Sequence, residues 1–158
     1  MAVKQSKRSG FTLVEILTYV SIYLLLTLLV APCVASVTNL RQRAEMDGFC
    51  QQLAADVTAL QQASLWGSGL QNKLVVNLNN QSYAVYREGQ LTKKVQLQTI
   101  GQGKLYFYSP STTSVRFSEE GAPQSYFAVL IKNRQQPRLV KKFEVQPVTG
   151  RVVISDSK

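Results

Sequence analysis

The longest apolar run of the chain extends from Phe11 to Val37 and contains one charged residue, Glu15. Its 27 positions exceed the roughly 20 helical residues that cross the hydrocarbon core of a bilayer. Three basic residues and no acid precede the run, which predicts a cytoplasmic N-terminus and an exported remainder. The sequence therefore predicts a single membrane-spanning helix over residues 11–37.

A carboxylate inside this run needs an explanation. An acid costs about 2.5–3.5 kcal/mol at the centre of a membrane helix and less near its end, and such residues usually mark a functional contact. Glu15 lies near the cytoplasmic end of the run. The simplest alternative to a functional role is therefore a carboxylate that reaches the polar interface.

Other N-terminal targeting segments fit the run poorly. A secretory signal peptide has an apolar core of about 7–15 residues, whereas this run is nearly twice as long and carries an acid. The stretch Val30-Ala31-Pro32-Cys33 weakly suggests a lipoprotein cleavage site, but proline directly before the cysteine makes a poor match.

The stretch KRSGFTLVE resembles the cleavage and methylation motif of type IV pilins and the related pseudopilins. It has a short basic leader that ends in Gly10, then Phe11, then Glu15 four residues later. Pro32 adds to the likeness, because helices of this family commonly contain a proline, and it predicts a bend in the helix. The resemblance implies that a prepilin peptidase cleaves after Gly10 and methylates the new amine of Phe11.

The resemblance also implies a role for Glu15. In the family, this glutamate is thought to pair with the N-terminal amine of a neighbouring subunit as it enters the filament. Each charge then compensates the other in surroundings where neither is favourable alone. Other pilin or pseudopilin subunits, the prepilin peptidase and, before assembly, the membrane are the partners that follow.

The pattern changes after Val37. Apolar or small residues recur at steps of three or four, which predicts that the helix continues as an amphipathic segment over residues 38–66; they are Met46, Phe49, Leu53, Val57, Leu60 and Ser64. Gly67-Ser68-Gly69 predicts its end. The predicted organisation is a leader over residues 1–10, the helix in two parts (11–37 and 38–66) and a β domain over residues 67–158.

Short β-like runs fill this domain, at residues 74–78, 83–86, 94–99, 105–108, 114–118, 125–132, 138–146 and 151–155. Turn signals separate them, which predicts an antiparallel sheet and an α+β fold in which the long helix packs on it. The segments FEVQPVTGRVVIS, LVVNLNNQSYAVYRE and VRFSEEGAPQ read as hairpins. They resemble, less specifically than the N-terminal motif, the β domain of minor pseudopilins of the H-like group.

Catalysis and metal binding find little support in the sequence. The chain has no histidine, two cysteines without a CxxC pair, no nucleophile motif and no phosphate-binding loop. We therefore expect neither enzymatic activity nor a cofactor. Cys33 and Cys50 lie 17 residues apart, which is roughly 25 Å along a helix and too far for a disulfide. Cys33 is expected to pack as a small apolar residue, and Cys50 as a packed thiol or an intermolecular link.

The exported segment from Gly121 to Phe143 is basic and contains no acid; its bases are Lys132, Arg134, Arg138, Lys141 and Lys142. Clustered bases can bind DNA phosphates, and Tyr126, Phe127 and Phe143 could stack on single strands if exposed. The favoured alternative is a set of solvent-facing charges that keep the domain soluble or contact neighbouring subunits.

Trp66, just before the glycines, is expected to pack in the core or between helix and sheet. The leader holds three of the 18 basic residues and none of the nine acidic ones, so the net charge of +9 becomes +6 after cleavage.

These inferences converge on a minor subunit of a type IV filament that is held in the cell membrane before it enters a cell-surface filament. The segment QQLAADVTALQQAS and the compact basic domain make a competence (DNA-uptake) pilus the first candidate. The alternatives are a pseudopilin of a type II secretion system, a subunit of an adhesive or twitching pilus, and an unprocessed single-pass protein that displays a binding domain.

Overall fold

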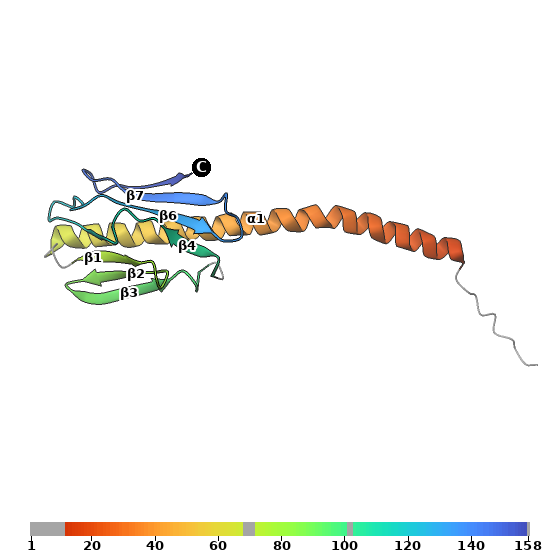
Figure 1. Cartoon of the computed structure of the whole chain (residues 1–158), viewed down its shortest axis with the longest axis horizontal. Coiled ribbons are helices and arrows are strands. Elements are labelled where there is room, and N and C mark those ends of the chain that lie inside the picture. Colours follow the sequence, from red (N-terminus) through yellow and green to blue (C-terminus); the bar gives the residue numbers. More distant parts are fainter. Residues whose placement is uncertain (1–11, 68–71, 101–102, 158) are drawn as a thin grey trace, which may run out of the picture. The chain divides into compact units, whose positions relative to one another are not determined.

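The computed structural model describes residues 12–67, 72–100 and 103–157, apart from the side chains of residues 31–35. The fold is α+β, as the sequence predicts, with one long helix followed by strands (Figure 1). The helix is α1 (Leu13–Trp66), and the strands are β1 (Lys73–Asn77), β2 (Ser82–Arg87), β3 (Gln90–Gln96), β4 (Leu105–Tyr108), β5 (Ser114–Arg116), β6 (Phe127–Asn133), β7 (Val140–Val145) and β8 (Val152–Asp156).

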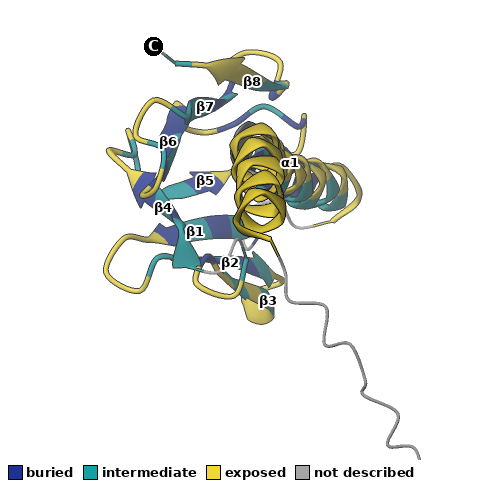
Figure 2. Cartoon of the chain, turned by 90° about the vertical axis from the view of Figure 1, so that its right-hand side faces the viewer, coloured by how far each residue is buried: buried dark blue, intermediate teal, exposed yellow. Residues whose placement is uncertain are grey.

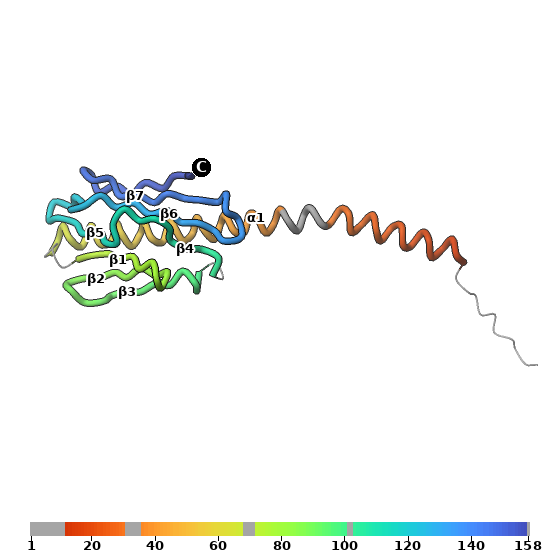
Figure 3. The backbone as a smooth tube through the Cα atoms, in the orientation of Figure 1, coloured from red at the N-terminus to blue at the C-terminus, as the bar shows by residue number. Residues whose placement is uncertain are grey.

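The strands form two four-stranded sheets rather than the single predicted sheet. Their orders are β3-β2-β1-β5 and β4-β6-β7-β8, and every pair is antiparallel. The chain leaves the first sheet after β3, contributes β4 to the second, returns for β5 and then completes the second sheet (Figure 3). Gln81 connects the two sheets, because its side-chain oxygen accepts a 2.6 Å hydrogen bond from the amide of Phe107 in β4.

The predicted hairpins are present, and their turns explain the residues found there. Glu88 and Gly89 both have positive φ between β2 and β3, as a two-residue type I′ turn requires. Gly150, with φ of 66°, closes the β7–β8 turn, and its amide donates to the carbonyl of Gln146. In the VRFSEEGAPQ hairpin, the amide of Ser118 donates to the carbonyl of Ala122.

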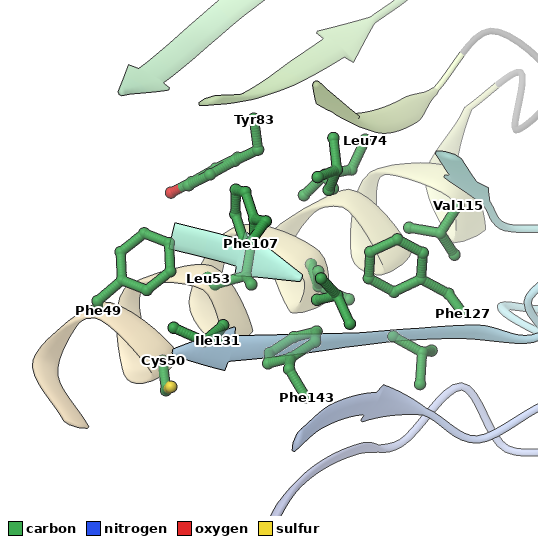
Figure 4. Close-up of a cluster of buried hydrophobic side chains, with 14 of the residues drawn as sticks. Phe49, Cys50, Leu53, Leu74, Tyr83, Phe107, Val115, Phe127, Ile131 and Phe143 are labelled. Atoms are coloured by element: carbon green, nitrogen blue, oxygen red, sulfur yellow. The ribbon is translucent and has the colours of Figure 1, made fainter. Parts of the chain in front are cut away.

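The C-terminal part of α1 lies against both sheets (Figure 2). The predicted inward face is confirmed: all six residues at the three- and four-residue steps are at most 1% exposed. Phe49 is central to this packing, with ring centroids 6.1 Å from Tyr83 of the first sheet and 5.8 Å from Phe107 of the second (Figure 4). One helix face therefore supplies the layer that both sheets need to bury their apolar sides.

The chain divides into two compact units between Arg41 and Gln42. In the first unit, all side chains from Thr12 to Val30 are exposed. Residues 13–30 have a mean hydropathy of 2.2 and are long and apolar enough to cross a membrane. Pro32 and Cys33 fall within α1, but their side chains lie outside the described part, so the predicted bend and the packing of Cys33 stay predictions.

Two packing expectations have opposite outcomes. Cys50 is a buried free thiol, which agrees with the packed alternative. Trp66, in contrast, is 89% exposed at the end of α1, so its predicted packing between helix and sheet is wrong. The inward stripe of α1 ends at Ser64, and Trp66 lies two residues further around the helix, away from the core.

Candidate functional site

Glu15 lies in the first turn of α1, three residues after Thr12, which caps the helix. The amide of Glu15 donates to the side-chain oxygen of Thr12 at 3.3 Å and to its carbonyl at 3.0 Å. Thr12 and Glu15 thus have the Thr-x-x-Glu spacing of a capping box, a signal that our sequence reading missed. A carboxylate also interacts favourably with the positive end of a helix dipole. Gly10 and Phe11, the predicted processing site, lie outside the described residues.

Three hydroxyl side chains within the apolar segment, those of Thr18, Ser21 and Thr27, are hydrogen-bonded to the helix backbone. The hydroxyl of Thr18 donates to the carbonyls of Val14 and Glu15, that of Ser21 to Leu17, and that of Thr27 to Leu24. A hydroxyl that donates to a backbone carbonyl costs much less free energy in an apolar medium than one without a partner. The carboxylate of Glu15 is consequently the one ionisable acid that this segment presents to its surroundings.

The five predicted basic residues do not form one patch. Leu130 pairs with Lys142 and Ile131 with Lys141 in the β6–β7 register. Ile131 is buried toward α1, so Lys141 is on the helix side of the sheet, and Lys132 and Lys142 are on the outer side. Alternation along two strands therefore separates residues that are close in sequence.

Lys141 is part of an ion network on the helix side. Its ammonium contacts the carboxylate of Asp47 on α1 and lies 3.5 Å from that of Asp156 on β8. The hydrogen bond with Asp47 raises the pKa of Lys141, with smaller help from Asp156. Only 18% of the Lys141 side chain is exposed, so this base ties the second sheet to the helix and is not a solvent-facing charge.

On the outer side, the bases have local partners. Lys142 lies 2.6 Å from the carboxylate of Glu144, which raises the pKa of Lys142, and the pKa of Glu144 is lowered in turn. Lys132 lies 3.7 Å from the ring centroid of Tyr108, and Arg134 lies 5.7 Å from that of Tyr106. These are cation–π distances.

The aromatic residues near these bases differ from those predicted. Phe127 and Phe143 are fully buried, so they cannot stack on a nucleic acid, and only Tyr126 is exposed. The structure brings Tyr106 and Tyr108 to the bases instead. The alternation in Leu-Tyr-Phe-Tyr of β4, with leucine and phenylalanine buried, was the signal that could have identified the tyrosines.

Arg138, the fifth base, lines a hollow of about 390 Å³ next to the Lys141 network, and Arg43 of α1 lines it as well. A short loop carries Arg138 between β6 and β7. Asn133 organises the loop by accepting the amide of Gln135 at 2.8 Å, and Gln42 of α1 donates to the side chain of Gln135 at 2.8 Å. Within the described part of the chain, the side chains of Arg43 and Arg138 make no hydrogen bond or ion pair.

No known protein family, curated protein or solved structure matches this chain. Among residues 12–67, 72–100 and 103–157, no three histidine, cysteine, aspartate or glutamate side chains gather as a metal site would require. What the described residues offer is an exposed apolar helix with one acid near its start, and a β unit with paired bases, an exposed turn and an arginine-lined hollow.

Proposed function

We propose that the chain is a filament subunit of the type IV pilin or pseudopilin kind, and a minor one. It is processed after Gly10, held in the membrane by the first part of α1, and then transferred into a helical filament. The observation that carries the proposal is the position of Glu15, four residues after Phe11 and inside an exposed apolar helix. The function is assembly through non-covalent contacts, without catalysis.

Burial supports the division of roles along α1. The apolar side chains of residues 13–30 are exposed in the first unit, whereas residues 46–64 present a face that is buried against the sheets of the second. The exposed segment can therefore exchange lipid contacts for contacts with helices of other subunits at little cost in apolar burial. In the proposed filament these segments form the core and the β unit forms the outside.

Charge compensation gives Glu15 its role. Cleavage after Gly10 creates a positive amine on Phe11, and this amine and the Glu15 carboxylate are each unfavourable in an apolar core. A contact between Glu15 of one subunit and the amine of another compensates both charges and sets the register between neighbouring helices. The cap at Thr12 offers a competing, purely structural role for Glu15, so the experiment must separate the two.

The experiment compares incorporation into filaments for Glu15→Ala, Glu15→Gln and Thr12→Ala. Glu15→Gln keeps a polar side chain of similar size but loses the charge, and Thr12→Ala removes the cap but keeps the charge. If charge pairing is the role, both Glu15 variants lose incorporation and Thr12→Ala retains it. Unchanged incorporation of Glu15→Ala would refute the role. Loss in Glu15→Ala and Thr12→Ala with retention in Glu15→Gln would assign Glu15 to capping, because glutamine also completes a capping box.

Processing separates the filament subunit from its rival, an unprocessed single-pass protein that displays a binding domain. Mass spectrometry of the chain from native membranes decides between them. A mature N-terminus at methylated Phe11 supports the filament subunit, and an intact leader supports the rival.

A competence pilus is the first candidate for the filament, and a type II secretion pseudopilus is the second. The two are distinguished by deleting the gene for this chain and measuring both DNA uptake and protein secretion. Loss of uptake with normal secretion supports the competence pilus, and the reverse result supports the pseudopilus.

A second, weaker proposal is that the basic residues bind DNA directly. Lys141 and Lys142 already pair with acids of the same chain, which makes them less available to DNA phosphates. A mobility-shift assay with the full chain in detergent tests it. A shift that weakens steeply with salt would support phosphate contacts. In that case Lys132→Gln should weaken the shift more than Lys141→Gln, because Lys132 lies on the outer side of the sheet. Absence of a shift at low salt would exclude DNA contact.

A further inference from the structure

The β unit has an arginine-lined hollow near one end and an exposed acidic turn near the other. Arg43 and Arg138 line the hollow, and Glu119 and Glu120 are exposed in the tight turn between β5 and β6. Within the described residues, none of these four side chains forms an ion pair. The chain therefore presents two charged surfaces of opposite sign.

The acidic turn is fixed to the C-terminal end of α1. The side-chain amide of Gln61 donates to the carbonyl of Gly121 at 2.7 Å and reaches the carbonyl of Thr149 at 3.4 Å. A Cβ on Gly121 would lie only 3.1 Å from the Leu65 side chain. The amide of Gly121 in turn donates to the carbonyl of Ser118. Glu119 and Glu120 are thus presented by a turn with a defined position.

The hollow is fixed to the same helix, further toward its start. Arg43 and Asp47 belong to α1, and Asp47 contacts Lys141, which also lines the hollow. Gln61 lies 18 residues after Arg43, which is about five complete helical turns and about 27 Å. The two charged surfaces therefore lie along the same stripe of α1, near opposite ends of the β unit.

From this arrangement we infer that Glu119 and Glu120 of one copy enter the Arg43–Arg138 hollow of a second copy. Arginine guanidinium groups bind carboxylates in bidentate geometry. Lys141 offsets one of the two acids at the hollow, Asp47 and Asp156. Three bases and two acids line the hollow, which leaves it a net charge of +1. We place the contact head to tail, with one turn-to-hollow contact between successive copies, and its repetition without closure gives an open series of subunits. The inference rests on the proposed function, because such a series suits a filament.

Charge reversal in differently tagged full-length copies tests the contact by copurification from detergent at low salt. One variant carries Arg43→Glu and Arg138→Glu, and the other carries Glu119→Arg and Glu120→Arg. Each alone should lower copurification by at least about tenfold, because like charges then face each other. Mixing the two variants should restore the signal to within about twofold, because opposite charges then meet whichever variant supplies the turn and whichever supplies the hollow. Unchanged copurification in either single reversal, or no recovery in the mixture, would overturn the inference.

The control pair is Arg87→Glu with Lys94→Glu, which makes the same change in charge at exposed positions of the first sheet. It should leave copurification unchanged. The neutral pair Arg43→Gln with Arg138→Gln should also weaken the contact and guards against misfolding of the reversed form. Cleavage before Phe11 is measured in parallel by mass spectrometry. An intact leader would refute the proposed function, whereas the contact between copies is decided by copurification alone.

Discussion

The hydroxyl of Tyr83 donates a 2.6 Å hydrogen bond to the carboxylate of Asp56, and this contact joins β2 to α1. The ammonium of Lys93 on β3 lies 2.8 Å from both oxygens of the same carboxylate. Tyr83 is fully buried, so its hydroxyl depends on Asp56 as the acceptor of its proton. Burial raises the pKa of Tyr83, and the hydrogen bond and the negative charge of Asp56 raise it further.

Replacing Asp56 with alanine should therefore destabilise the β unit by about 2–3 kcal/mol, because a buried hydroxyl loses its acceptor. Tyr83→Phe should cost about 1 kcal/mol, because it removes the donor and leaves Asp56 with Lys93. The double variant should cost less than the sum of the two. Chemical unfolding of the full chain in detergent measures these changes, with the half-exposed Tyr108→Phe as control. Strict additivity would show that the two residues are not coupled.

Alkaline pH should weaken the fold between about pH 9 and 11. Burial raises the pKa of the Cys50 thiol from 9.0 to about 11, so in this window the unfolded chain loses the proton first. Stability then falls as pH rises, by up to about 3 kcal/mol for this group. Unfolding measured across this range should show the fall, and Cys50→Ala should reduce its slope. If Cys50→Ala leaves the slope of stability against pH unchanged, Cys50 is not the cause of the fall. The raised pKa of Tyr83 adds to the fall at the alkaline end of the range.

Replacing Gly150 or Gly48 with alanine should change the free energy of unfolding in opposite directions. A Cβ at Gly150 would meet the side-chain amide of Gln61 and lie 2.6 Å from the carbonyl of Gly121, at a φ of 66°. We expect a loss of at least about 2 kcal/mol. Gly48 is an exposed helical residue with nothing within 4 Å of the added atom, so its replacement should gain about 0.5–1 kcal/mol. Thermal unfolding compares the two, and a loss at both positions would contradict the argument.

Replacing Gln81 should reduce the stability of the fold more than replacing an exposed residue of a similar kind. Its side-chain oxygen accepts the amide of the buried Phe107, so Gln81→Ala leaves that amide without its acceptor and should cost about 1–3 kcal/mol. Hydrogen exchange of the Phe107 amide should accelerate as well. The exposed Gln96→Ala is the matched control. Equal stability and exchange in both variants would show that Gln81 does not join the sheets.

Periodicity predicted most of the elements because these obey a local rule. The buried face of α1 from Met46 to Ser64 follows helical spacing, and strands such as β1 and β4 alternate in burial. Alternation is absent from β8 and weak in the exposed β3, which begins at Gln90, four residues before the predicted run at 94–99. The separation into two sheets could not be predicted in the same way. It depends on the pairing of β1 with β5 and of β4 with β6, and nothing local specifies partners so distant in sequence.

The same limit applies to the candidate site. Glu15 and the spacing around it are local features, so they are visible in the sequence. The partners of the basic residues are not, because Lys141 meets Asp47 through tertiary packing between β7 and α1. Arg43 and Arg138 lie 95 residues apart in the chain, and only the fold brings them to one hollow.

Trp66 is the only tryptophan of the chain, and its indole lies in water at the end of α1. Its fluorescence therefore reports on this one place and is insensitive to the packing of the core. A subunit that covers the end of the helix would shift the emission to shorter wavelength, while the chain alone would emit as a solvated indole. The molecule thus carries a natural optical probe for contacts made at that end.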